Sequence, residues 1–65
     1  MKQTTIEALL RVYTRLEEIT TELYTLADTA VDMGDFEDAS LLQTRADILY
    51  EQMENLDFVI LELEG

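Results

Sequence analysis

The apolar residues of this chain recur at alternating intervals of three and four, a spacing that places them on one face of an α-helix. In the first half, the pattern comprises Thr5, Leu9, Val12, Leu16, Ile19, Leu23, Leu26, Ala30 and Met33. In the second half, it comprises Ala39, Leu42, Ala46, Leu49, Met53, Leu56, Ile60 and Leu63. The sequence therefore predicts two long helices, each with a heptad seam of apolar residues.

A single break separates the two predicted helices. Proline is absent, and Gly34 is the only glycine before the C-terminal residue. Glycine readily adopts the left-handed conformation that ends many helices, so Gly34 is predicted to end the first one. We therefore expect an all-α fold, an antiparallel hairpin with helices at 4–33 and 36–63 and a turn at 34–35. Residues 1–65 are predicted to form one domain.

The starts of both predicted helices carry capping residues. Thr4 is followed three positions later by Glu7, which predicts a capping box at the first helix. Asp35 and Asp38 have the same spacing and predict a weaker cap at the second helix.

Two helices cannot enclose a core, because each buries one side and leaves the other open to water. More apolar residues lie beside the seams, among them Ala27. The economical solution is a homodimer that forms an antiparallel four-helix bundle, since a two-fold axis satisfies both chains with one surface. The residues predicted at this dimer interface are Leu41, Ile48, Val59, Ile6 and Tyr13.

Composition and charge then narrow the possible functions. The chain has 65 residues, of which 15 are acidic and 4 are basic, and the resulting charge of −11 repels DNA and RNA. Direct nucleic-acid binding is therefore not expected. The absence of Cys and His removes disulfides, thiolate nucleophiles and most zinc or haem ligation, so no cofactor or metal is predicted.

The location of the protein is predicted from its apolar runs. No run approaches the roughly 20 residues of a membrane span, and the N-terminus lacks the order of charged and apolar residues found in a signal peptide. We expect a cytoplasmic protein without membrane binding.

Two features of the second helix are candidate partner-binding surfaces. One is a row of carboxylates at helical spacing, which is either a solvated face or a surface for a basic protein. The other is an apolar end, which either packs against the N-terminal turn or the dimer mate, or docks a partner. The residues concerned are Asp47, Glu51, Glu54 and Asp57 in the row, and Phe58 and Leu61 at the end.

The turn region carries a third concentration of acids. Asp28, Asp32, Asp35, Glu37 and Asp38 lie within eleven residues without a cation. Acids in the first turn of a helix stabilise its dipole, which explains part of this cluster without a function. A solvated cap and a recognition surface remain the two interpretations.

An enzymatic interpretation starts from Glu54 and Asp57, which the spacing Glu-x-x-Asp places on one helix face. Magnesium-dependent helical nucleotide pyrophosphatases carry such a pair together with a Glu-Glu-x-x-Glu helix. Here Glu17 and Glu18 are followed by Glu22, which departs from that spacing. We therefore expect a protein that is not an enzyme.

The plan of the chain is similar to that of Rop-like proteins, helical hairpins of this length that dimerise into four-helix bundles. The run from Ala46 to Tyr50 carries part of the resemblance. Rop-like RNA binding uses a basic and aromatic face on the first helix, and here acidic residues surround Lys2, Arg11 and Arg15. The resemblance therefore implies the dimeric architecture and not the RNA binding.

The sequence favours an acidic, non-enzymatic protein–protein interaction module that acts as a homodimeric bundle. The alternative is an acidic inhibitor of phage or plasmid type, which mimics nucleic acid and blocks a defence protein or another nucleic-acid-binding protein. Both expect a partner with a basic surface.

Overall fold

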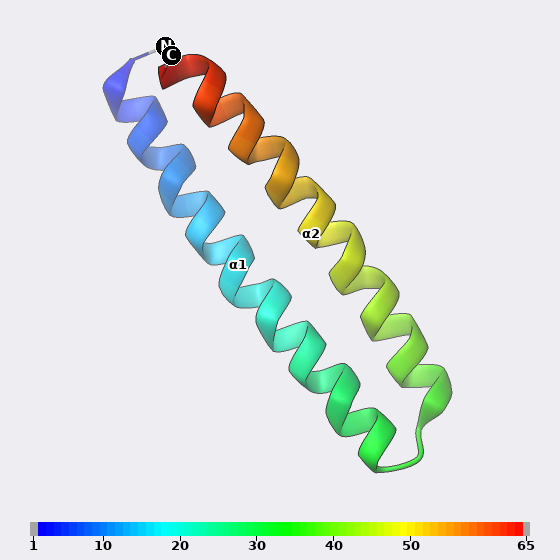
Figure 1. Ribbon diagram of the computed structural model, residues 1–65. Helices are drawn as coiled ribbons and strands as arrows, with labels where there is room; N and C mark the ends of the chain where they lie inside the picture. The colour runs from blue at the N-terminus through cyan, green and yellow to red at the C-terminus, as the bar shows by residue number, and fades with distance from the viewer. Residues whose placement is uncertain (1, 65) are drawn as a thin grey trace.

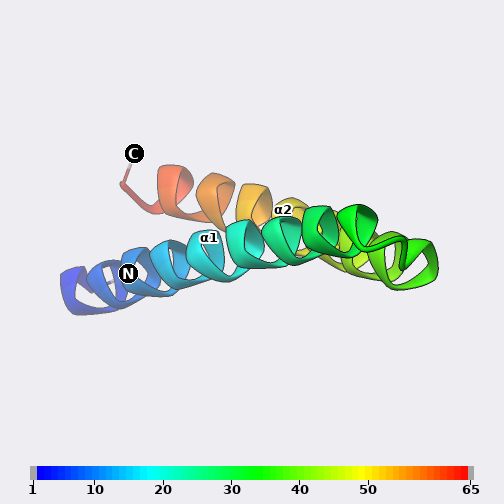
Figure 2. The same ribbon diagram turned by 90° about the horizontal axis from the view of Figure 1, so that it is seen from below.

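The protein is an antiparallel hairpin of two long α-helices. The computed structural model describes residues 2–64, and the side chains of residues 2–62. Helix α1 spans Gln3–Asp32 and helix α2 spans Phe36–Glu64, so the predicted fold class and both helices are confirmed to within a residue at each end. The helices lie side by side in Figure 1 and cross at a shallow angle in Figure 2. The hairpin is a rod of 48 × 15 × 11 Å.

The turn between the helices is closed by backbone hydrogen bonds around Gly34. Its φ of 80° lies in the left-handed region, as predicted. The Gly34 amide donates to the carbonyl of Val31 at 3.0 Å, and the Asp35 amide donates to that of Ala30 at 2.8 Å. This pair of bonds is the Schellman pattern, which satisfies carbonyls that the end of a helix would otherwise leave free. The tight turn fixes how the two helices face each other.

The variant Gly34→Ala tests the turn. A Cβ atom at Gly34 would meet nothing within 4 Å, so the only cost is that of the positive φ. We expect alanine to lower the free energy of unfolding by about 1–2 kcal/mol, measured as a shift of the urea midpoint. Gly34→Asn is the matched control, since asparagine tolerates this conformation, and equal midpoints for both variants would contradict the explanation.

The start of α1 differs from the prediction. The helix begins at Gln3, Lys2 occupies the N-cap position, and no side chain caps the free amides there. The Lys2 carbonyl instead accepts hydrogen bonds from the amides of Thr5 and Ile6. The predicted capping box of Thr4 and Glu7 is therefore wrong, because Thr4 already lies inside the helix.

Helix α2 starts at the predicted residue, Phe36, whereas the predicted side-chain cap by Asp35 and Asp38 stays a prediction. The helix begins directly after Asp35, whose carbonyl accepts a hydrogen bond from the amide of Ala39 at 3.0 Å. Glu37 and Asp38 lie in the first turn, where carboxylates stabilise the helix dipole.

The side of α2 that faces α1 is the predicted one. Its buried residues are Ala39, Ala46, Met53 and Ile60. Its half-buried residues include Leu42, Leu49 and Leu56. All seven belong to the predicted seam, whereas the side chain of Leu63 lies outside the described residues.

The side of α1 that faces α2 is rotated from the prediction by one residue. The residues of this seam are buried or half-buried, namely Ile6, Leu9, Tyr13, Leu16, Thr20, Leu23, Ala27 and Ala30. The residues predicted in the seam but found exposed are Thr5, Val12, Ile19, Leu26 and Met33. Small side chains explain the choice, because Thr20 and Ala27 let the helices approach closely where Ile19 and Leu26 would hold them apart.

The core between the helices is thin. Its buried apolar residues are Ile6, Ala27, Ala30, Ala39, Ala46, Met53 and Ile60, four of which are alanines. Because alanine contributes little apolar area, this contact stabilises the hairpin only weakly.

Candidate functional site

The hairpin has two unlike flanks, one on each side of the seam. Residues that directly follow a seam residue lie on one flank, and residues that directly precede one lie on the other. Tyr24 of α1 follows Leu23, and Tyr50 of α2 follows Leu49. Both tyrosines line the same groove, so flanks of the same kind meet on the same side of this antiparallel pair. We name them the groove flank and the open flank.

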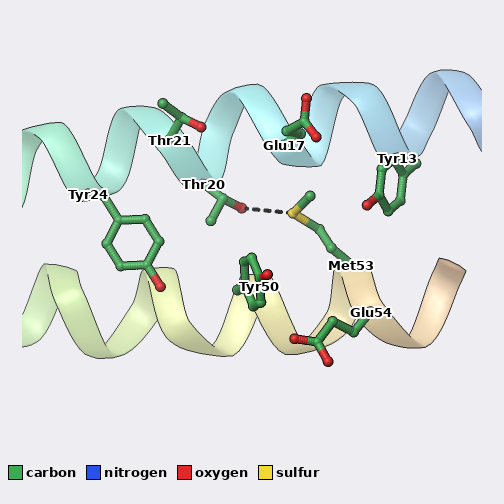
Figure 3. A pocket seen from close by; sticks show the side chains of 8 residues that line it. All are labelled: Tyr13, Glu17, Thr20, Thr21, Tyr24, Tyr50, Met53 and Glu54. Carbon is green, nitrogen blue, oxygen red and sulfur yellow. Dashed lines mark hydrogen bonds between the residues drawn. The ribbon is translucent and has the colours of Figure 1, made fainter.

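The groove flank contains a cavity of about 300 Å³ between the two helices, the tyrosine groove. All three tyrosines of the chain line it, and Figure 3 shows them pointing into the space between α1 and α2. The lining residues are Tyr13, Glu17, Thr20, Thr21, Tyr24, Tyr50, Met53 and Glu54. The groove is thus an aromatic cavity with a carboxylate from each helix beside it.

Thr20 and Met53 form the contact between the helices at this level. The Thr20 hydroxyl lies 3.5 Å from the Met53 sulfur and donates to the carbonyl of Leu16 at 2.6 Å (Figure 3). Thr20 is only 3% exposed, and these partners satisfy its hydroxyl. Hydrophobicity does not single out Thr20 in the sequence, although this residue lies seven positions after Tyr13 and seven before Ala27.

A hydrogen bond ties the two helices together at one end of the groove. The Tyr24 hydroxyl of α1 donates to the Asp47 carboxylate of α2. This bond, together with partial burial and the charge of Asp47, raises the pKa of Tyr24 to about 12. Burial and the charges of Asp57 and Glu17 raise the pKa of Tyr13 as well. Neighbouring carboxylates contribute to both shifts, although the hydrogen bond to Asp47 dominates for Tyr24 and burial dominates for Tyr13.

Removing the acceptor should restore the ordinary titration of Tyr24. A raised pKa favours the protonated phenol in the folded chain, so this contribution to stability is complete below pH 10 and is lost as the pH rises through about 12. We expect Asp47→Ala to lower the pKa of Tyr24 towards 10, measured from the ring carbon shifts of that residue by NMR. Glu51→Ala is the control, and an equal effect of both variants would contradict the assignment.

The groove flank is strongly acidic. Among the side chains of residues 2–62, this flank carries six carboxylates and no cation, so their formal charge is −6. These carboxylates belong to Glu7, Glu17, Asp28, Asp47, Glu54 and Asp57. A second copy of this flank would be repelled, whereas a cationic group would be attracted.

The open flank is apolar and nearly neutral. Six of its aliphatic side chains are between 41% and 57% exposed, and we name them the open face: Val12, Ile19, Leu26, Leu41, Ile48 and Val59. The charged residues of this flank are Arg15, Glu22, Asp38, Arg45 and Glu62. Their formal sum is −1, so the two flanks of one rod differ sharply in charge.

Comparison with known proteins gives no relative. No protein-family model, curated protein or solved structure matches the chain. Function is therefore argued from the two flanks themselves.

Of the residues predicted to bind a partner, Asp47, Glu54, Asp57 and Leu61 lie on the groove flank, and Glu51 and Phe58 lie on the outer side of α2. Asp47, Glu51, Glu54 and Asp57 are all exposed, and Glu54 is the one that lines the groove. The apolar pair near the end of α2 is also exposed, with Phe58 at 66% and Leu61 at 58%. The hairpin is accounted for by its seam, without a contact of Phe58 or Leu61 with the N-terminal turn.

The residues predicted at the dimer interface divide into two groups. Leu41, Ile48 and Val59 belong to the open face. Ile6, however, is buried at 5% exposure in the seam, and Tyr13 lines the groove on the other flank. Ile6 and Tyr13 are therefore not part of the open face.

Two further observations concern other kinds of site. Among the described residues, no group of three His, Cys, Asp or Glu side chains is close enough to hold a metal ion. Within the same part of the chain, neither helix has a stretch apolar enough to span a membrane.

Proposed function

We propose that the chain is an acidic, non-enzymatic protein–protein interaction module that works as a homodimeric four-helix bundle. In this proposal, the open faces of two copies pack against each other, and the groove flanks remain on the outside. The observation that carries the proposal is the open face, six aliphatic side chains on one flank of a hairpin whose own core is thin.

The solvent-exposed area of the single hairpin supports a partner as large as a second hairpin. The chain exposes 5028 Å², whereas a compact monomer of 7.5 kDa exposes about 4200 Å². The excess is close to the roughly 800 Å² that each partner buries in an interface of standard size. A second hairpin on the open face would therefore give the chain the burial that a compact protein of its length has.

The charge distribution of the two flanks favours a second copy of this chain as the partner. The open flank carries both signs, with Arg15 and Arg45 among three acids, so a two-fold axis can place unlike charges opposite each other. The groove flank, with six carboxylates, cannot pair with itself in this way. The chain as a whole carries −11, and it can self-associate only where its charge is locally low.

The test of the dimer is the solution mass by light scattering across a dilution series, with helicity followed by circular dichroism. We expect a mass near twice 7.5 kDa, and a loss of helicity that accompanies dissociation on dilution. A fully helical monomer at all concentrations would overturn the proposed dimer.

The second candidate function is inhibition by mimicry of nucleic acid, and the charge of the groove flank favours it. Six carboxylates on one side of a rod resemble a row of phosphates to a basic groove. A mimic loses affinity for its target steeply with salt and competes with DNA or RNA for it, and an apolar docking module does neither. The double variant Glu54→Lys and Asp57→Lys reverses two charges of the groove flank and should abolish binding of a mimic to its target. Unchanged binding would exclude the groove flank as the mimicking surface.

A further inference from the structure

The tyrosine groove has the chemistry of a site for a cationic side chain. Aromatic faces attract a cation placed over them, and a guanidinium can stack on such a face while its N–H groups reach a carboxylate. Tyr13, Tyr24 and Tyr50 supply the faces, and Glu17 and Glu54 supply one carboxylate from each helix (Figure 3). We propose that this groove binds the guanidinium of an arginine side chain presented by a basic protein partner.

No cation of the described chain lines the groove. Arg15 and Arg45 belong to the open flank, and Arg11 lies with Arg15 along a shallow surface of α1 that includes Leu10 and Glu18. The field of the groove carboxylates is therefore not neutralised by a lining Lys or Arg, and a cation from outside would meet it directly. Charge complementarity thus selects a basic partner.

The size and shape of the groove select a single side chain. Its volume of about 300 Å³ lies at the lower end of the range for ligand pockets, about 300–1000 Å³. Phosphate-bearing ligands are excluded by the carboxylates, which would repel them. A flat guanidinium can stack on a tyrosine ring while its N–H groups reach a carboxylate at the edge of the groove, whereas an ammonium group offers only a compact charge.

This inference rests on the proposed function only in taking the ligand to be part of a protein. The groove lies within one chain and on the flank opposite the open face, so a dimer through the open face leaves it accessible. Dimer and groove therefore make separate predictions.

The probe is a short Arg-Gly-Arg-Gly peptide amide, and the control peptide has citrulline in place of arginine, which keeps the shape and removes the charge. Binding to the full chain is followed by NMR from the ring signals of the three tyrosines. We expect saturable shifts at these rings with a dissociation constant of about a millimolar for the arginine peptide, and none for the citrulline peptide.

Two variants locate the site. Glu54→Gln removes one groove carboxylate and should weaken binding about fivefold. Glu51→Gln removes the same charge one turn away on the same helix, outside the groove lining, and should weaken it less than twofold. Tyr50→Leu, at a half-exposed position that tolerates change, should weaken binding by about two- to fivefold through loss of the aromatic face.

Equal effects of the two glutamate variants, or binding of the citrulline peptide, would overturn the proposal, because either result means a diffuse acidic surface. Equally tight binding of a Lys-Gly-Lys-Gly peptide would overturn the assignment to arginine. Light scattering on the same samples separates the two proposals. A dimeric mass without tyrosine shifts rejects the groove, and a monomeric mass with intact shifts rejects the dimer.

Discussion

Replacing Ile19 by aspartate is expected to convert the proposed dimer into a poorly helical monomer. Ile19 lies in the middle of the open face and is 48% exposed in the single hairpin. Burial of an isoleucine side chain contributes about 1.5–3 kcal/mol, and a two-fold axis counts every substitution twice. The loss of about 3–6 kcal/mol corresponds to a dissociation constant that rises by about two to four orders of magnitude.

Helicity should fall together with the mass. The seam buries mainly alanines, so the contact within a single hairpin stabilises its two helices only weakly. Thr25→Asp is the matched control, because it adds the same charge to α1 at an exposed position away from both flanks. Light scattering and circular dichroism at several concentrations check both variants. If Ile19→Asp keeps the mass and helicity of the parent chain, the open face is not the dimer interface.

The side of α2 that faces α1 could be predicted from the sequence because only one apolar stripe along this helix is uninterrupted. Ala39, Ala46, Met53 and Ile60 have no competing stripe beside them, since their neighbours on both flanks are mostly polar. Gly34 was also predictable, because it is the one internal residue that adopts a positive φ without cost.

The seam of α1 could not be read from hydrophobicity. Two stripes share Leu9, Leu16, Leu23 and Ala30 and differ in the residues between them. Hydrophobicity favours the more apolar stripe, which contains Val12 and Ile19. The less apolar one, with Thr20 and Ala27, forms the seam. Close contact of two helices depends on side-chain size at the crossing, and apolar character alone does not report it.

The tyrosine groove could not be predicted from the sequence, for a related reason. Tyr13 and Tyr24 come from one helix and Tyr50 from the other, so their meeting depends on the register between the helices. The acidic row on α2 was visible as a spacing pattern, yet only Glu54 of that row lines the groove. Once the seam is known, the position of Tyr24 and Tyr50 directly after seam residues does identify their flank.

One physical explanation accounts for both the exposed aliphatic stripe of α1 and the proposed dimer. Small residues in the seam allow the helices of one chain to pack closely, and the larger aliphatic residues are then left on the open face. A hairpin that buried Val12, Ile19 and Leu26 in its own seam would lose the α1 half of the open face. The arrangement thus divides the apolar residues between contact within a chain and the proposed contact between chains.

Ala46→Leu tests the close packing on which this explanation depends. Ala46 is 0% exposed. The contact of Thr20 with Met53 sets the register, which brings Ala27, itself 4% exposed, opposite Ala46 seven residues further along. A leucine has no free space between these two positions, so it must push the helices apart or adopt a strained rotamer. We expect the free energy of unfolding to fall by about 1–3 kcal/mol, which is a large part of the stability of so short a chain.

The effect should depend on position and not on the added leucine itself. Thr44→Leu places the same side chain two residues away on the exposed side of α2, where we expect a change within about 0.5 kcal/mol. Urea unfolding at fixed protein concentration measures both variants, since a dimer links stability to concentration. A destabilised Ala46→Leu beside an unaffected Thr44→Leu would confirm that alanine size sets the helix separation. Unchanged or higher stability of Ala46→Leu would mean that the helices do not approach closely there, and the explanation for the exposed stripe of α1 would fail with it.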